Sequence, residues 1–262
     1  MYLLYFLVSL MASIIGAICG VGGGIIIKPV LDATGTFSVS SVSFLSGCTV
    51  MTMSVISVLK SKNSEDSVDA NSATPLAIGA VIGGLLGKWT FEFLKTVFRN
   101  ETHLGGLQAA LLIIITIGTL LYSIYSKKIH TLHVKSRIVS VLIGLILGIL
   151  SSFLGIGGGP INLIVLFFFF SMSTKKAAAN SLYIIMFSQM SSLLQTLLSD
   201  TVPSVSFVIL SLVIGAGVLG GIIGGHINKK ISAHVVDKLF IGLMIVIVLI
   251  NIYNLINFTI LI

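Results

Sequence analysis

The sequence predicts an all-α polytopic membrane protein, and three observations support this fold class. The 262-residue chain is 56% hydrophobic and only 9% charged, whereas a soluble domain carries about 25% charged residues. The apolar residues come in uninterrupted blocks instead of amphipathic stripes. Each block is longer than the roughly 20 residues that a helix needs to cross a bilayer. A soluble domain is excluded, because there is too little charge to cover a water-facing surface of this size.

Short polar hinges divide the chain into about eight hydrophobic segments. They cover residues 1–27, 37–59, 74–94, 104–126, 138–170, 177–199, 204–228 and 239–262. The most basic hinge lies near the middle of the chain. We therefore predict a first transmembrane repeat over 1–126, a basic cytoplasmic linker over 127–137 and a second transmembrane repeat over 138–262. The net charge of +7 is scattered through short loops without a basic run, so no nucleic-acid partner is expected.

The two halves carry the same motifs in the same order. The GVGGG sequence of residues 20–24 recurs 135 positions later as GIGGG at 155–159. At the same displacement Ser46 matches Ser181. A glycine ladder recurs 138 positions apart, with Gly79, Gly83 and Gly87 matching Gly217, Gly221 and Gly225. Three motifs in one order favour an internal duplication, which is typical of secondary transporters.

The fifth segment, 138–170, is too long for one crossing and contains the second glycine motif followed by Pro160. Consecutive glycines and a proline disfavour a continuous helix by roughly 1 and 3 kcal/mol per residue. We therefore expect a break at 155–160 and, by the repeat, another at 20–24. Each repeat would then open with a helix that is either re-entrant or only kinked.

The loop charges favour the re-entrant alternative. If both broken helices turn back, eleven of the 15 Lys and Arg residues share one side of the membrane, and the other side keeps Lys28, Lys88, Lys95 and Arg99. If every segment crosses, the division is nine against six. The stronger bias fits the positive-inside rule. It predicts a cell-membrane protein with both termini outside and with two inverted halves of three crossings each.

The glycine breaks are the strongest candidates for a binding site. Residues without a Cβ atom allow backbone N–H groups to converge into a concavity that binds anions. The half-helix after each break also presents its free N–H groups and its positive dipole end. Irregular backbone at membrane depth survives only where protein or a water-filled cavity satisfies it. The alternative is that the glycines only allow close helix packing.

The first motif and its flank, GVGGGIIIKP at residues 20–29, resemble the GxGGGxxxxP signature of the sulfite exporter TauE/SafE family of membrane permeases. Residues 155–159 resemble the family's second copy, and 179–182 resemble its Ala-Thr-Ser-Leu stretch, with Asn180 in place of threonine. The resemblance covers essentially the whole chain. It implies a permease for sulfite, organosulfonates or related small sulfur-containing anions, coupled to the proton gradient.

Polar residues in the segments that follow the breaks extend the candidate site. Ser46, Ser181 and Gln189 could donate hydrogen bonds to an oxyanion without fixing a countercharge; the alternative is helix–helix hydrogen bonding, worth about 0.6 kcal/mol on average. The full predicted substrate site is Gly20, Gly22, Gly23, Gly24, Ser46, Gly155, Gly157, Gly158, Gly159, Asn180, Ser181 and Gln189.

The remaining polar residues predict no catalytic, cofactor or metal site. No paired carboxylates or Ser/His/Asp set occurs within a segment, so an enzyme is not expected. For Lys28 we favour an interfacial side chain that snorkels to the membrane surface. Lys88 and Glu92 have the i, i+4 spacing of an ion pair. We expect a secondary permease whose partners are a small anion, protons and the bilayer. An anion channel is the main alternative and a membrane-embedded enzyme the weaker one, and the oligomeric state stays open.

Overall fold

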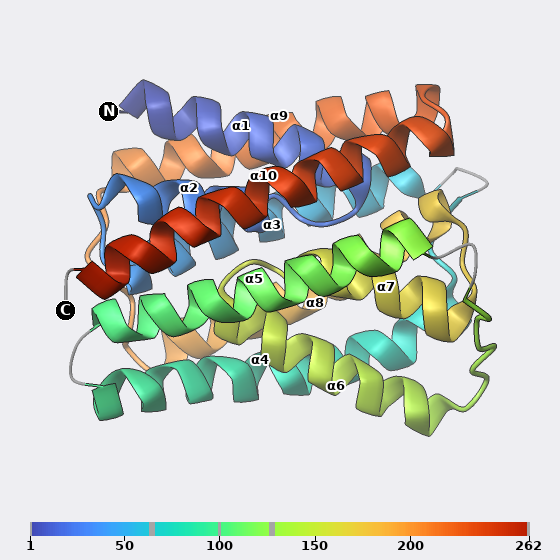
Figure 1. Ribbon diagram of the computed structural model, residues 1–262, viewed down its shortest axis with the longest axis horizontal. Helices are drawn as coiled ribbons and strands as arrows, with labels where there is room; N and C mark the ends of the chain where they lie inside the picture. The colour runs from blue at the N-terminus through green and yellow to red at the C-terminus, as the bar shows by residue number, and fades with distance from the viewer. Residues whose placement is uncertain (1, 63–65, 99–100, 126–128, 261–262) are drawn as a thin grey trace.

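The computed structural model describes residues 2–62, 66–98, 101–125 and 129–260, and every regular element within them is a helix (Figure 1). The first half contains α1 (Tyr2–Cys19), α2 (Gly24–Thr34), α3 (Val39–Ser61), α4 (Ala70–Phe98) and α5 (Glu101–Tyr125). The second half contains α6 (Arg137–Leu154), α7 (Gly159–Phe170), α8 (Thr174–Leu198), α9 (Phe207–Lys230) and α10 (Ala233–Ile260).

Eight of these helices, all except α2 and α7, are long and apolar enough to cross a membrane. The predicted fold class, an all-α polytopic membrane protein, is confirmed. Arg99, Lys127 and Lys128, which contributed to the predicted distribution of loop charges, lie outside the described residues.

Local sequence explains where the helices around the breaks begin and end. Gly35 ends α2 with a φ of 61°, and Gly155 ends α6 with a φ of 65°. At the start of α3 the Ser38 side chain caps the helix by accepting the Ser41 N–H at 3.2 Å. Pro160 stands in the first turn of α7, where its missing N–H would have no intrahelical partner.

Both broken helices turn back toward the end of the molecule at which they start. The Tyr5 hydroxyl near the start of α1 lies 3.0 Å from the Thr36 hydroxyl, just beyond the end of α2. In the second half, the N–H of Leu132, ahead of α6, donates to the carbonyl of Phe168 in α7 at 2.7 Å. Figure 1 shows the two termini at one end of the bundle and the α5–α6 connection at the other.

Glycines allow two helix pairs to pack backbone to backbone. A Cβ on Gly83 of α4 would collide with the Leu145 carbonyl of α6, and one on Gly224 of α9 would lie 2.5 Å from the Ile14 carbonyl of α1. Small residues at such positions let membrane helices approach closely.

The glycines of α9 face two different helices, and the match of the two glycine ladders stays a prediction. Gly217 and Gly221, matched in the sequence to Gly79 and Gly83, face α3 rather than α1. The residues of α9 that face α1 are Gly220 and Gly224. These lie 137 positions after Gly83 and Gly87, the residues of α4 that face α6. Because α9 is rich in glycine on two faces, the sequence alone did not show which face met which helix.

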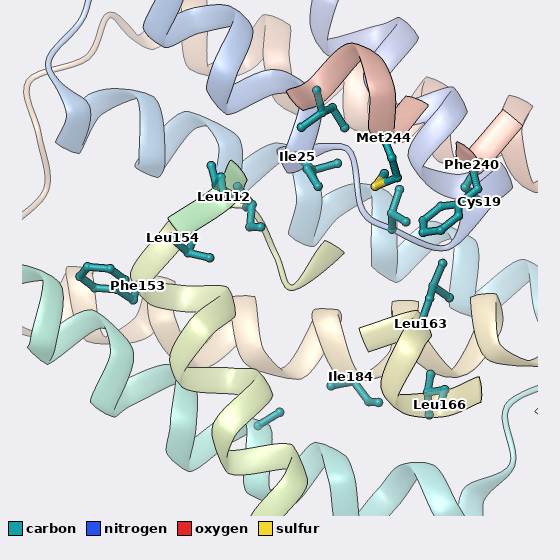
Figure 2. Packing of buried hydrophobic residues seen from close by; sticks show 14 of the residues in the cluster. Cys19, Ile25, Leu112, Phe153, Leu154, Leu163, Leu166, Ile184, Phe240 and Met244 are labelled. Carbon is teal, nitrogen blue, oxygen red and sulfur yellow. The ribbon is translucent and has the colours of Figure 1, made fainter. Parts of the chain in front are cut away.

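The main apolar core surrounds the two breaks (Figure 2). Ile25 of α2 and Met244 of α10 lie on one side of it, and Leu163 of α7 lies on the other (Figure 2). All three side chains are at most 2% exposed. The half-helices are therefore packed within the protein, where the breaks between them and the preceding helices are shielded from lipid.

Candidate functional site

Each break contains glycines in a backbone conformation that other residues rarely adopt. In the first break Gly22 has a φ of 73°, and in the second break Gly157 has a φ of 80°. A side chain in this left-handed region costs roughly 1–2 kcal/mol. The glycines thus allow a sharp reversal between α1 and α2 and between α6 and α7.

In the part of the chain that the structure describes, the breaks contain buried backbone donors for which no partner is found. Within the described residues, no hydrogen-bond acceptor is found for the N–H groups of Gly22, Gly23, Gly24, Ile25, Ile156, Gly157, Gly158 and Gly159. Several of them belong to the first turn of a half-helix, where no intrahelical acceptor exists. Such groups cost several kcal/mol each in an apolar interior. They are therefore available to water or to an anionic ligand.

The two breaks meet at one pair of side chains. A Cβ on Gly22 would lie 3.4 Å from both Val50 of α3 and Ile185 of α8. A Cβ on Gly157 would lie 2.5 Å from Val50 and 3.4 Å from Ile185. We call this group of four residues the break junction. Val50 and Ile185 are themselves 135 positions apart, the displacement of the glycine motifs.

Two buried hydroxyls lie one turn from the break junction. Ser46 precedes Val50 by four residues on α3, and Ser181 precedes Ile185 by four residues on α8. Both side chains are fully buried, and neither Oγ has a hydrogen-bond partner among the described residues. The Ser46 Oγ lies 2.8 Å from where a Cβ on Gly24 would stand. Both hydroxyls are thus free to donate to a bound group.

Four of the predicted site glycines lie together, and four pack elsewhere. Gly24 and Gly159 join the two glycines of the break junction, because each faces the backbone of the opposite break. Gly23 packs against Ala12 of α1, and Gly20 packs against Ala178 of α8. A Cβ on Gly155 would lie 2.7 Å from the Ser43 hydroxyl, and one on Gly158 would lie 2.6 Å from the Asn162 amide.

The two predicted amide residues have partners of their own. Asn180 accepts the N–H of Asp69 at 3.0 Å and donates to the Lys176 carbonyl at 2.7 Å, so it joins α8 to the start of α4. Gln189 donates to the Ser151 hydroxyl of α6 at 3.3 Å. Neither residue is among the groups at the break junction.

The prediction that Lys28 snorkels to the membrane surface is wrong. Its side chain is 0% exposed, and its Nζ lies 3.0 Å from the Asp32 carboxylate one turn further along α2. The half-helix is covered by α10, whose Asn254 donates to the Pro29 carbonyl at 2.8 Å, so Lys28 faces protein instead of lipid. The expected pair of Lys88 and Glu92 is confirmed at 2.7 Å.

Two cavities approach the breaks from opposite ends of the bundle. The larger, about 410 Å³, lies where α3 and α9 end and α8 begins. The smaller, about 20 Å³, lies toward the start of α3 and the end of α8, which is room for about one water. Many of their lining positions correspond at the 135-residue displacement: Ala17 and Ser152, Ser57 and Ser192, Ala178 and Ser43.

The fold and the breaks define a class of protein: a multi-pass helical membrane protein in which two half-helices reverse at buried glycine breaks. The chain matches the model of the family described as sulfite exporter TauE/SafE over residues 5–250, nearly its whole length, and it belongs to this family of membrane transport proteins. The family resemblance found in the sequence is confirmed. No curated protein and no solved structure matches the chain.

Proposed function

We propose that the protein is a secondary permease that moves a small sulfur-containing anion, such as sulfite, thiosulfate or an organosulfonate. The observation that carries this proposal is the break junction, where glycines of two chain segments lie against the same two side chains, one helical turn from the buried, unpartnered hydroxyls of Ser46 and Ser181. Hydrogen bonds to a charged acceptor are about twice as strong as neutral ones. Neutral donors can therefore hold an oxyanion, and without a fixed countercharge the anion can also leave.

The proposal includes two inverted repeats, over 1–126 and 138–262. In the repeat, α1, α3 and α4 correspond to α6, α8 and α9. The packing of the helices is reciprocal in this sense and supports the repeat: α4 packs on α6 and α9 on α1, while α3 packs on α9 and α8 on α4. In this arrangement each repeat supplies one break to a shared site. Transporters with inverted repeats hold substrate at the repeat interface.

We further propose that the anion passes by alternating access. The unequal cavities support this step, because positions that are equivalent by the repeat line a large cavity at one end and a nearly filled one at the other. The smaller cavity is spanned by a hydrogen bond of 2.7 Å between Ser152 and Ser192. Its counterpart positions, Ala17 and Ser57, cannot form a side-chain hydrogen bond. If the larger cavity closed while the smaller one opened, access to the break junction would move from one end of the bundle to the other.

The proposed orientation places both termini outside the cell, and cysteine labelling tests it. Thr36→Cys and Asp200→Cys should react with a membrane-impermeant reagent added to intact cells, whereas His130→Cys and Lys176→Cys should not. Reaction at His130→Cys in intact cells would reverse the orientation.

Flux into proteoliposomes tests the function. The purified chain should carry sulfite, thiosulfate or sulfoacetate faster than sulfate or chloride, with a rate that saturates. Proton coupling, which the family resemblance implies, predicts that an imposed pH gradient changes the initial rate. A rate that does not saturate and ignores the pH gradient would indicate a channel. Absence of flux for all five anions from folded protein would refute the proposal.

A further inference from the structure

We propose that the larger cavity is a second anion site, an entry vestibule that collects the oxyanion before it reaches the break junction. We define the vestibule by Lys60, Lys175 and Lys229, which reach it from α3, α8 and α9. The inference rests on the proposed permease function and adds to it a face of the protein from which the anion is captured.

The charge of the vestibule is unbalanced. Among the described lining residues, its three lysines are accompanied by one carboxylate, that of Asp66. In the described part of the chain none of the three lysines forms an ion pair, whereas the neighbouring Lys176 lies 3.9 Å from Asp69. A cleft lined by one sign of charge and walled by apolar helices focuses the field and attracts ions of the opposite sign. The vestibule therefore attracts anions.

The size of the vestibule indicates a collecting site instead of a tight one. About 410 Å³ is ample for a small oxyanion together with several waters, since a water occupies about 30 Å³ in the liquid. The lysines are partly exposed, so their attraction is screened by salt over about 8 Å at physiological ionic strength. The anion is thus concentrated electrostatically while it keeps part of its hydration shell.

The floor of the vestibule is the first break. Ala178 lines the vestibule and also contacts Gly20, the first glycine of the motif. Asn228, another lining residue, donates to the Ile18 carbonyl in the last turn of α1 at 2.6 Å. Between the vestibule and the break junction lies a small apolar cluster, in which the lining residues Ala17 and Leu182 pack with Met53 and with Val50 and Ile185 of the junction.

The equivalent cavity at the opposite end has no comparable charge among the residues that the structure describes. Lys88, which lines it, is neutralised by Glu92 at 2.7 Å, and its Nζ lies 4.8 Å from the Phe91 ring centre. Capture should therefore be one-sided, with a lower KM from the face that bears the vestibule. In the proposed orientation this is the cytoplasmic face, which suits export.

Matched charge variants test the vestibule. Each lysine that lines the vestibule has a second lysine within two residues that does not line the vestibule. These neighbours are Lys62, Lys176 and Lys230. The lining triple Lys60→Gln/Lys175→Gln/Lys229→Gln and the control triple Lys62→Gln/Lys176→Gln/Lys230→Gln remove the same net charge. Initial sulfite transport would be measured in right-side-out and inside-out vesicles at low and high KCl.

The lining triple should raise the KM for sulfite about 10-fold in one vesicle orientation only, and should remove most of the salt dependence. The control triple should change the KM less than twofold. Equal effects of the two triples, or a wild-type KM in the lining triple, would overturn the vestibule while leaving the permease intact.

A second readout does not depend on transport. In a chain without its native cysteines, Ser61→Cys lines the vestibule and reports the local potential. The measured quantity is the ratio of its reaction rate with the anionic reagent 2-sulfonatoethyl methanethiosulfonate to its rate with neutral methyl methanethiosulfonate. This ratio should fall when Lys60 and Lys229 are changed to Gln. An unchanged ratio refutes the vestibule even if sulfite is not carried. Failure of wild-type sulfite flux with a changed ratio refutes sulfite as substrate and supports the vestibule.

Discussion

Gly157→Ala is the substitution that most sharply probes the break junction. Gly157 has a φ of 80°, and an added Cβ would lie 2.5 Å from Val50. The conformational cost is about 1–2 kcal/mol, and overpacking a filled interior costs typically 1–3 kcal/mol. We therefore expect a loss of about 2–5 kcal/mol in the free energy of unfolding. If the shifted backbone also loses one N–H donor to the anion, transport falls by about 1.5–3 kcal/mol, or roughly 10- to 150-fold.

Two comparisons separate these effects. Gly35 has a φ of 61° but nothing within 4 Å of an added Cβ, so Gly35→Ala should incur only the conformational cost and keep normal transport. Val50→Ala removes the methyl groups that the new Cβ would meet. The double variant Gly157→Ala/Val50→Ala should therefore recover folded protein relative to Gly157→Ala, while its transport stays low compared with Val50→Ala alone.

The assay is the initial rate of sulfite uptake into proteoliposomes, divided by the amount of monodisperse protein from gel filtration. Thermal unfolding in detergent measures stability separately. A double variant that is folded and carries sulfite as fast as Val50→Ala would refute the role of the glycine backbone in anion binding. Reduced transport in Gly35→Ala would show that strain at any glycine is enough to impair the protein.

Three further outcomes follow from the structure. Lys28→Met should lower the free energy of unfolding by about 3–5 kcal/mol, measured by thermal unfolding, because it leaves the Asp32 carboxylate buried without its partner. The double variant Lys28→Met/Asp32→Leu should recover most of that loss, and no recovery would contradict the buried ion pair. Gly83→Ala should lower the yield of folded protein while the rate per folded molecule stays normal, whereas Gly215→Ala, with nothing within 4 Å, should change neither. Ser181→Ala should raise the KM about 2- to 13-fold if the hydroxyl donates one neutral hydrogen bond of 0.5–1.5 kcal/mol, and an unchanged KM would remove it from the site.

Much of the fold could be predicted from the sequence, because membrane spans depend on long runs of apolar residues. The eight long apolar helices needed only hydropathy and length, and the glycine motif inside the unusually long segment 138–170 indicated where α6 must end. The family could be recognised because the motif at 20–29 is contiguous. The ion pair of Lys88 and Glu92 followed from helical spacing alone.

The rest of the site depends on contacts between distant segments. Val50 and Ile185 are ordinary apolar residues, so nothing marked them as the place where the breaks meet, except that they repeat at the displacement of the glycine motifs. The burial of Lys28 results from its cover by α10, which no local pattern reveals. Asn180 was matched to a family motif, but the structure uses its amide to join α8 to the start of α4.

The central claim, alternating access around the break junction, is tested most directly by paired cysteine reporters in a chain without native cysteines. Ser57→Cys lies in the larger cavity and Ser192→Cys at the equivalent position in the smaller one. We predict that Ser57→Cys reacts from one face and Ser192→Cys only from the other, and that saturating sulfite changes their rates in opposite directions. Simultaneous reaction of both reporters from both faces, unaffected by sulfite, would contradict alternating access and indicate a continuous pore.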